Sequence, residues 1–160
     1  MLDRGRRLVI DPAAHHLGDN IRTTPPFLDP PLPEGGVLER TFDGGAIGLN
    51  QAFLVLDVVD VVGETAGSPY SNLIAKGELR TYVAINGKRV DYINRHITTT
   101  NETPERIKIR IPLDLLKPGT NTLRIEQTGI ANDPTWLDDL GILQIAVQTA
   151  AAESSPSGRP

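Results

Sequence analysis

The chain is poor in the residues that define many protein chemistries. It has no cysteine, which excludes disulfide bonds, thiolate metal ligands and a cysteine nucleophile. Aromatic residues make up only 4% of its 160 positions, with a single tryptophan. The apolar run near its start, Leu8-Val9-Ile10, is too short for a signal-peptide core or a membrane span. These absences predict a chain made in the cytoplasm, without a signal peptide or a transmembrane segment.

Charge and catalytic motifs are equally sparse. Sixteen Lys and Arg residues against 20 Asp and Glu residues give a formal net charge of −4, which argues against a broad electrostatic surface for nucleic acid or anionic lipid. The sequence contains neither a Gly-x-Ser-x-Gly motif nor a phosphate-binding glycine loop. Its three histidines, His15, His16 and His96, lack metal-ligand spacing. We therefore predict a protein that is not an enzyme and that binds neither nucleic acid nor a membrane.

Proline and glycine, by contrast, are abundant, with 13 and 15 residues, and they help to divide the chain into three zones. Residues 1–36 hold six of the prolines and show neither a helical nor a strand period, which predicts an extended arm. Residues 37–148 carry the periodic apolar pattern of a folded domain. Residues 149–160 are small and polar, which is typical of a tail that is flexible or held by a partner.

Strand signals dominate the middle zone. In Arg106–Pro112, three isoleucines alternate with Lys108 and Arg110, which predicts a strand with one buried and one solvated face. The same alternation recurs within Asn121–Gln127 and at three residues near the end, Leu143, Ile145 and Val147. The segment Ala52–Val62 is apolar on both faces, so it is either a central covered strand or a surface that meets a partner.

Turn signals separate these strands. Asn86-Gly87 has the residues of a type I′ hairpin turn, in which both central positions need a positive φ, and it should join Leu79–Ile85 to Lys88–Ile93. A second turn lies at Lys117-Pro118-Gly119-Thr120, and the one helical signal is a single turn near Asp114–Leu116. About eight short strands with such turns predict an all-β fold, an antiparallel jelly-roll β-sandwich with an extended proline-rich N-terminal arm.

Three segments carry a family resemblance. VAINGKRVDYIN, ERIKIRIPLDLLKPGTNTLRIEQTG and WLDDLGILQIAV resemble the galactose-binding-like β-jelly-roll, a fold found in carbohydrate-binding modules and in sandwich domains that accompany glycoside hydrolases. The matching features are the Asn86-Gly87 hairpin, the Pro112–Leu123 segment and the acidic pair Asp138-Asp139 before the last strand. The resemblance covers residues 37–148 and leaves out both ends of the chain.

The resemblance implies two kinds of site. Many relatives hold a structural calcium ion between an acidic residue of the first strand and one just before the last, which here implies Glu39 or Asp43 with Asp138 or Asp139, unless these residues only cap solvated loops. Relatives that bind glycans present exposed aromatic rings, and Trp136 and Tyr70 occupy suitable loops. Trp136 could instead plug the end of the sandwich. Positive charge near the hairpin adds Arg95 and His96 as ligand contacts, the alternative being a solvated surface.

Two functional hypotheses follow. The first is a non-enzymatic assembly protein, such as a viral capsid cement or decoration subunit incorporated into a particle, whose arm contacts neighbouring subunits. Its anchors would be the apolar residues of the arm, Leu8, Val9, Ile10, Ile21, Phe27, Leu28 and Leu32. The arm could instead wrap its own sandwich and cover the outer face of Ala52–Val62. The second hypothesis is a carbohydrate-binding module or accessory domain whose partner is a polysaccharide, with no cofactor or with a structural calcium ion.

Overall fold

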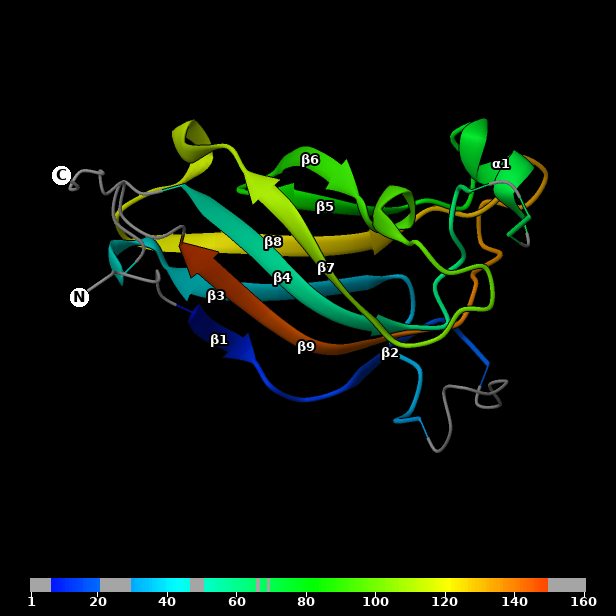
Figure 1. Cartoon of the computed structure of the whole chain (residues 1–160), viewed down its shortest axis with the longest axis horizontal. Helices are drawn as coiled ribbons and strands as arrows, with labels where there is room; N and C mark the ends of the chain where they lie inside the picture. The colour runs from blue at the N-terminus through cyan, green and yellow to red at the C-terminus, as the bar shows by residue number, and fades with distance from the viewer. Residues whose placement is uncertain (1–6, 21–29, 47–50, 66, 69, 150–160) are drawn as a thin grey trace, which may run out of the picture.

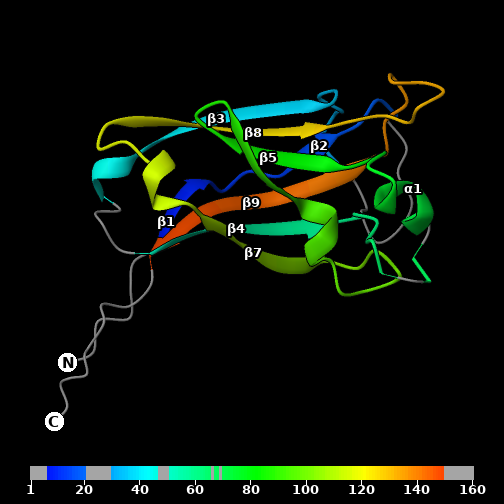
Figure 2. The same ribbon diagram turned by 90° about the horizontal axis from the view of Figure 1, so that it is seen from above.

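The computed structural model describes residues 7–20, 30–46, 51–65, 67–68 and 70–149. Nine strands in these residues form two antiparallel sheets, which Figures 1 and 2 show as two layers. The five-stranded sheet contains, in spatial order, β1 (Arg7–Asp11), β9 (Leu140–Thr149), β4 (Ala52–Val59) and β7 (Glu105–Ile111), with β2 (His15–Leu17) also paired to β9. The four-stranded sheet has the order β3 (Val37–Asp43), β8 (Thr120–Gln127), β5 (Thr81–Ile85) and β6 (Lys88–Tyr92). The predicted β-sandwich is confirmed.

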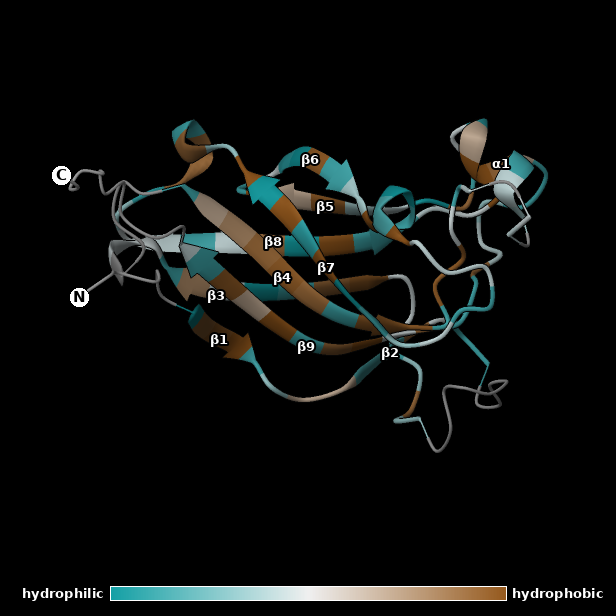
Figure 3. Ribbon diagram, viewed as in Figure 1, coloured by the Kyte–Doolittle hydropathy of each residue, from teal (hydrophilic) through white to brown (hydrophobic). Residues whose placement is uncertain are grey.

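Alternating side chains from both sheets build the core between the layers. On β7, Ile107, Ile109 and Ile111 are at most 3% exposed, while the residues between them are exposed. Strand β8 contributes Leu123 and Ile125 in the same way. Figure 3 shows the alternation of apolar and polar residues along β7. A side-chain period of two buries one face of a strand and leaves the other exposed. The observed burial follows this period, so the two predicted strands are confirmed.

The Asn86-Gly87 hairpin forms as predicted. It joins β5 to β6, and the φ angles of Asn86 and Gly87 are 51° and 85°. The side chain of Asn86 also fixes a neighbouring turn, because its Nδ2 donates to the carbonyl of Leu115 at 2.7 Å and to Oδ1 of Asn121 at 2.9 Å. The predicted helical turn is a 3₁₀ helix at Leu113–Leu115. The five-residue helix α1 (Ser71–Ala75) lies in a segment where no helix was predicted.

Strand β4 is central, between β9 and β7, which is the first of the two predicted alternatives. Its outward residue Val55 is only 2% exposed. Lys108 of β7 and Ala146 of β9 stand in register on either side of Val55, and Nζ of Lys108 lies 4.9 Å from the ring centroid of Phe53. The aliphatic stem of a lysine can cover apolar surface while its charge stays in water. Side chains of the same sheet therefore help to cover this outer face.

The N-terminal segment departs from the predicted arm. Strands β1 and β2 both pair with β9, so described residues before position 37 belong to the sandwich. They lie at the edge of the sheet and do not cover the outer face of β4, as Figure 2 shows. Leu17 is fully buried in the core. The short apolar run Leu8-Val9-Ile10 has enough strand character to add to an edge whose hydrogen-bonding groups need partners.

The predicted anchors of the arm differ in their exposure and packing. Leu8, Val9 and Leu32 are 37%, 45% and 78% exposed, and Ile10 packs partly against the core. Three further predicted anchors, Ile21, Phe27 and Leu28, lie outside the described residues. At the other end, β9 continues to Thr149, one residue beyond the predicted domain boundary, and residues 150–160 also lie outside the description.

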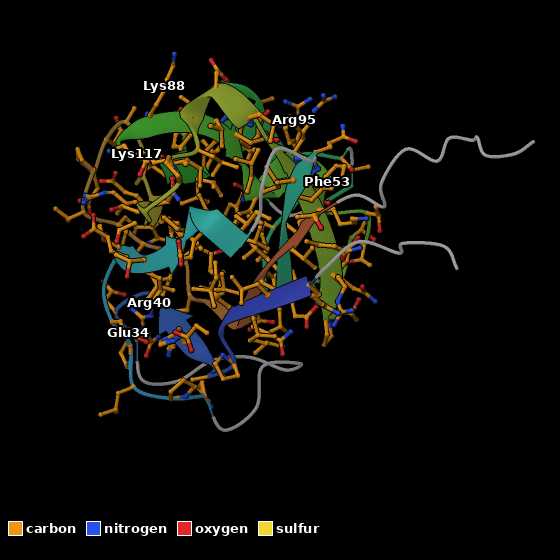
Figure 4. The ribbon with its side chains drawn as sticks, turned by 90° about the vertical axis from the view of Figure 1, so that its left-hand side faces the viewer. Glu34, Arg40, Phe53, Lys88, Arg95 and Lys117 are labelled. Atoms are coloured by element: carbon orange, nitrogen blue, oxygen red, sulfur yellow. The ribbon has the colours of Figure 1, made fainter. Side chains whose placement is uncertain are left out.

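A polar network fastens this N-terminal segment to the opposite sheet. Nε2 of His15 lies 2.7 Å from the carboxylate of Asp11, and Nδ1 of the same ring lies 2.6 Å from the carboxylate of Glu34. Arg40 of β3 donates from Nε to Asp11 at 2.6 Å. Figure 4 shows Glu34 and Arg40 beside the blue strands of the N-terminal segment. The network joins β1 and β2 to the four-stranded sheet.

Strand β9 contains a bulge that the periodic pattern did not predict. Asp57 of β4 pairs with Gln144, but its neighbour Val58 pairs with Ile142, so Leu143 has no partner on β4. An extra residue reverses the alternation of a strand at that point. Ile142 and Ile145 are therefore both fully buried, whereas Leu143 is half-buried and is not the inward residue that the alternation predicted.

Within the described residues, no helix is long and apolar enough to cross a membrane.

Candidate functional site

Two exposed aromatic rings meet in the loops at the α1 end of the sandwich. The rings of Tyr70, which precedes α1, and Trp136, in the loop before β9, contact edge to face with centroids 5.9 Å apart and an interplanar angle of 70°. They are 48% and 37% exposed. Figure 1 shows α1 beside the orange loop that contains residue 136. The structure thus brings together the two residues that the sequence singled out as a platform for sugar rings.

The backbone of Tyr70 is strained. Its φ and ψ are 61° and 12°, in the left-handed region that a bulky residue adopts at a cost of about 1 kcal/mol or more. The strain persists because the carbonyl of Tyr70 accepts hydrogen bonds from the amides of Leu73 and Ile74, at 3.0 and 3.1 Å. Strained backbone is concentrated at functional sites, since elsewhere a better residue would relieve it.

A small apolar cluster at the α1 end of the sandwich includes a residue of α1 itself. Val62, Ile74 and Leu79 are at most 2% exposed, and Tyr92 and Ile130 pack against them. Two hydrogen bonds tie the α1 segment to the loop that carries the tryptophan. The amide of Leu79 donates to the carbonyl of Gly129 at 3.0 Å, and the amide of Ala131 donates to Glu78 at 2.6 Å.

The loop of Trp136 is held by its own hydrogen bonds. The carbonyl of Asp133 accepts from the amide of Trp136 at 3.0 Å and from the amide of Ile130 at 3.2 Å. The carboxylate of Asp133 accepts from the hydroxyl of Thr135 at 2.7 Å. A loop that is already ordered loses less entropy when it binds a ligand. The indole ring is therefore presented by a preorganised loop.

Arg95 and His96, the other predicted glycan contacts, have different neighbours. Both follow β6 in a 3₁₀ helix at Ile93–His96. Nε2 of His96 lies 2.7 Å from Asp91, and the guanidinium of Arg95 lies 3.5 Å from the same carboxylate and 5.9 Å from the ring centroid of Tyr92. Their contacts are thus with Asp91 and Tyr92, and none joins them to the aromatic pair.

The four acidic residues proposed for calcium do not form one site. Glu39 and Asp43 lie on β3, where Glu39 accepts a hydrogen bond from Arg124 at 2.9 Å and Asp43 accepts one from the amide of Gly45 at 2.9 Å. Asp138 and Asp139 lie before β9, in the other sheet. In the described part of the chain, no three His, Asp or Glu side chains are arranged to hold a metal ion. These residues as placed do not fit calcium ligation, and the ion stays a prediction.

Asp138 and Asp139 instead meet two acidic residues from other loops at the α1 end. Asp60 follows β4, Glu102 precedes β7, and the amide of Asp60 donates to the carbonyl of Glu102 at 3.0 Å. Burial, reinforced by the charges of Glu102 and Asp139, raises the pKa of Asp60 to about 6. Burial and the same two neighbours, with Asp60, raise the pKa of Asp138 to about 7. We call Asp60, Glu102, Asp138 and Asp139 the acidic cluster.

The acidic cluster is tied to β2 by a buried histidine. Nε2 of His16 lies 2.7 Å from Oδ1 of Asp139, and the histidine side chain is fully buried. Gly18 makes this approach possible, because a Cβ at that position would lie 2.0 Å from the same carboxylate oxygen. The sequence analysis missed Asp60, Glu102 and His16 here. Their proximity depends on strand order, so no local signal could have shown it.

Comparisons with known proteins give matches of structure only. No protein-family model matches the sequence, and no curated protein matches it. The chain is similar in structure to a native family 35 carbohydrate-binding module from Clostridium thermocellum, with a TM-score of 0.51, 10% identity, and coverage of 91% of this chain and 99% of that one.

Two further similar structures are parts of larger proteins. BuGH86, solved in complex with neoagarooctaose, matches with a TM-score of 0.54 and 12% identity over 90% of this chain and 18% of that chain. A β-porphyranase of glycoside hydrolase family 86 from Bacteroides plebeius matches with a TM-score of 0.51 and 14% identity, over 91% and 20%. The chain therefore spans about a fifth of these two proteins. The likenesses confirm the predicted galactose-binding-like sandwich fold.

Proposed function

We propose that this chain is a non-catalytic carbohydrate-binding module that binds a polysaccharide through Tyr70 and Trp136. The likeness to a family 35 module supports this hypothesis, because almost the whole of each chain is covered. The glycoside hydrolase matches agree with an accessory domain, since in those proteins the similar part is a fraction of a larger chain. Fold alone does not define a ligand, so the proposal depends on the site.

The observation that carries the proposal is the exposed aromatic pair, in which Tyr70 has a strained backbone. An indole or phenol ring offers a flat apolar face on which the C–H face of a sugar can pack, and each ring also keeps a polar group for a hydrogen bond. Trp136 is not a buried plug of the sandwich end, since it is 37% exposed. The segments that carry the two rings are fixed by their own hydrogen bonds, so the rings form a preorganised surface.

The assembly hypothesis loses support on two grounds. The similar structures described above are a carbohydrate-binding module and two glycoside hydrolase family 86 proteins, which give no support to a capsid or decoration role. In addition, β1 and β2 are hydrogen-bonded within their own sheet, so that part of the predicted arm is occupied inside the molecule. We therefore do not propose a role in particle assembly.

Affinity gel electrophoresis with a panel of soluble polysaccharides tests the proposal. At least one polysaccharide should retard the wild-type chain. Trp136→Ala and Tyr70→Ala should each weaken the affinity derived from this retardation by about tenfold, which is the effect of losing one stacking or hydrogen-bonding contact. Tyr70→Phe keeps the ring and serves as the matched control. Wild-type mobility that no polysaccharide changes, or full retardation of Trp136→Ala, would contradict the proposal.

A further inference from the structure

The outer face of the four-stranded sheet carries a groove away from the aromatic pair. Three hollows of about 300, 240 and 440 Å³ lie along it. The first and second share Tyr82 and Arg89 in their walls, and the second and third share Gly87 and Arg124. The three hollows are therefore neighbouring parts of one groove, which we call the sheet groove.

The sheet register explains why this face is hollowed. One row of paired residues crosses all four strands, and it consists of Glu39, Arg124, Ala84 and Arg89. Ala84 is the small residue between two long arginine side chains, so the sheet surface is low at its position. The groove extends from Thr128, which directly follows β8, to Thr122 within β8, and six residues of extended chain correspond to about 20 Å.

Both arginines in the walls are held in position. The guanidinium of Arg89 lies 3.9 Å from the ring centroid of Tyr82. Arg124 donates to Glu39 at 2.9 Å and to Glu126 at 3.3 Å, and all three side chains are at least 37% exposed. Exposed ion pairs of this kind add little to stability. They do fix donors and acceptors in place, which lowers the entropy lost when a ligand binds.

The charges of the groove indicate the class of ligand. Its walls contain three cations, Arg89, Lys117 and Arg124, and three anions, Glu39, Glu78 and Glu126. Figure 4 looks at the molecule from the end opposite α1 and shows Lys117 there, at the far end of the groove. Equal numbers of both signs give no net attraction for an acidic polymer. A sugar hydroxyl both donates and accepts hydrogen bonds, so it can use both kinds of group.

We propose that the sheet groove is a second binding site, which accommodates several consecutive residues of an uncharged polysaccharide chain. Sugar hydroxyls take hydrogen bonds from Arg89 and Arg124 and donate to the carboxylates of Glu39 and Glu126 beside Arg124. The first hollow is lined by Ile130, Ala131 and Pro134, which belong to the same loop as Trp136. One chain can thus extend from the aromatic pair along the sheet. This inference rests on the proposed function but uses different residues, so each can fail separately.

Calorimetric titration of the full chain tests the groove. The probes are barley β-glucan, galactomannan and agarose oligosaccharides of increasing length, with polygalacturonate as the acidic probe. The affinity for a neutral ligand should rise with its length, and Arg89→Ala should weaken binding of the longest ligand by about tenfold. Thr122→Trp fills the third hollow with a residue that strands tolerate. This variant should abolish the increase in affinity with ligand length. Arg110→Ala, on the exposed face of β7, is the matched control and should bind like the wild type.

Three results separate the possible failures. If Arg89→Ala and Thr122→Trp bind every ligand as the wild type does while Trp136→Ala loses binding, the sheet groove is wrong and the proposed function stands. If only polygalacturonate binds, and more weakly as salt is added, the uncharged ligand is wrong. If no probe binds the wild type, both proposals fail. Thermal unfolding of each variant shows whether a loss of binding reflects a loss of folding.

Discussion

Nε2 of His16 lies 2.7 Å from Oδ1 of Asp139, although the two residues are 123 positions apart in the sequence. His16 belongs to β2, at the edge of the five-stranded sheet, and Asp139 directly precedes β9, the strand with which β2 pairs. The contact closes the sandwich at the end where the candidate sugar-binding loops lie. It also makes the N-terminal segment part of the fold that supports these loops.

Replacing this histidine should destabilise the domain. His16→Ala removes a fully buried side chain and leaves Asp139 without its imidazole partner, so we expect the free energy of unfolding to fall by about 2–4 kcal/mol. His96→Ala is the matched control, because its Nε2 also lies 2.7 Å from an aspartate but its side chain is 27% exposed. It should cost less than about 1 kcal/mol. Urea unfolding measures both, and equal losses would contradict the structural role of β2.

The acidic cluster should make stability depend on pH. The pKa of Asp60 is about 6 in the folded chain, above its ordinary value of about 4, so the folded state binds more protons between these pH values. The free energy of unfolding therefore decreases as the pH rises from about 4 through about 6. Asparagine cannot ionise and tolerates the positive φ of 59° at this position. Asp60→Asn should thus be more stable than the wild type at pH 8, by about 2 kcal/mol, and no more stable at pH 4.

Denaturant unfolding across this pH range, with EDTA present to remove divalent ions, checks the prediction. Asp114→Asn, at an exposed position, should change stability by less than about 0.5 kcal/mol at either pH. Parallel stability curves for the wild type and Asp60→Asn would show that Asp60 has no raised pKa.

The strained tyrosine should reverse the usual preference between alanine and glycine. In most positions glycine is the less stable residue, because it loses more conformational freedom on folding. At Tyr70, with φ at 61°, alanine keeps the strain and glycine does not. We expect Tyr70→Gly to be more stable than Tyr70→Ala by about 1 kcal/mol, measured as the difference in free energy of unfolding. A more stable alanine variant would mean that the left-handed backbone is absent in solution.

A buried asparagine should be among the residues least tolerant of replacement. Asn94 is 1% exposed, and its Oδ1 accepts from the amide of Thr81 at 2.8 Å while its Nδ2 donates to the carbonyl of Val62 at 2.9 Å. Asn94→Ala leaves both buried backbone groups without partners and should cost about 2–4 kcal/mol. Asn132→Ala, in an exposed turn, should change stability by less than about 0.5 kcal/mol. Guanidinium unfolding compares the two, and similar losses would count against the bridging role.

Local patterns in the sequence sufficed to predict several strands and turns of the fold. The alternation in Arg106–Pro112 predicts β7 because a strand buries every second side chain, and that rule involves only neighbours in the chain. Asn86-Gly87 predicts its hairpin because the positive φ angles depend on those two residues alone. Trp136 and Tyr70 could be selected from the sequence for a similar reason, since a loop position and an aromatic ring are both visible there.

Everything that depends on contacts between distant segments was decided by the tertiary structure. The bulge at Leu143, the pairing of β1 and β2 with β9, and the contact between the rings of Tyr70 and Trp136 are of this kind. So are the raised pKa values of the acidic cluster, because burial and neighbouring charge come from loops of different strands. The sequence by itself determined strands such as β7 and β8 and the turn at Asn86-Gly87. Strand order and packing decided which residues meet, since those free energies arise only when the two sheets close on one core.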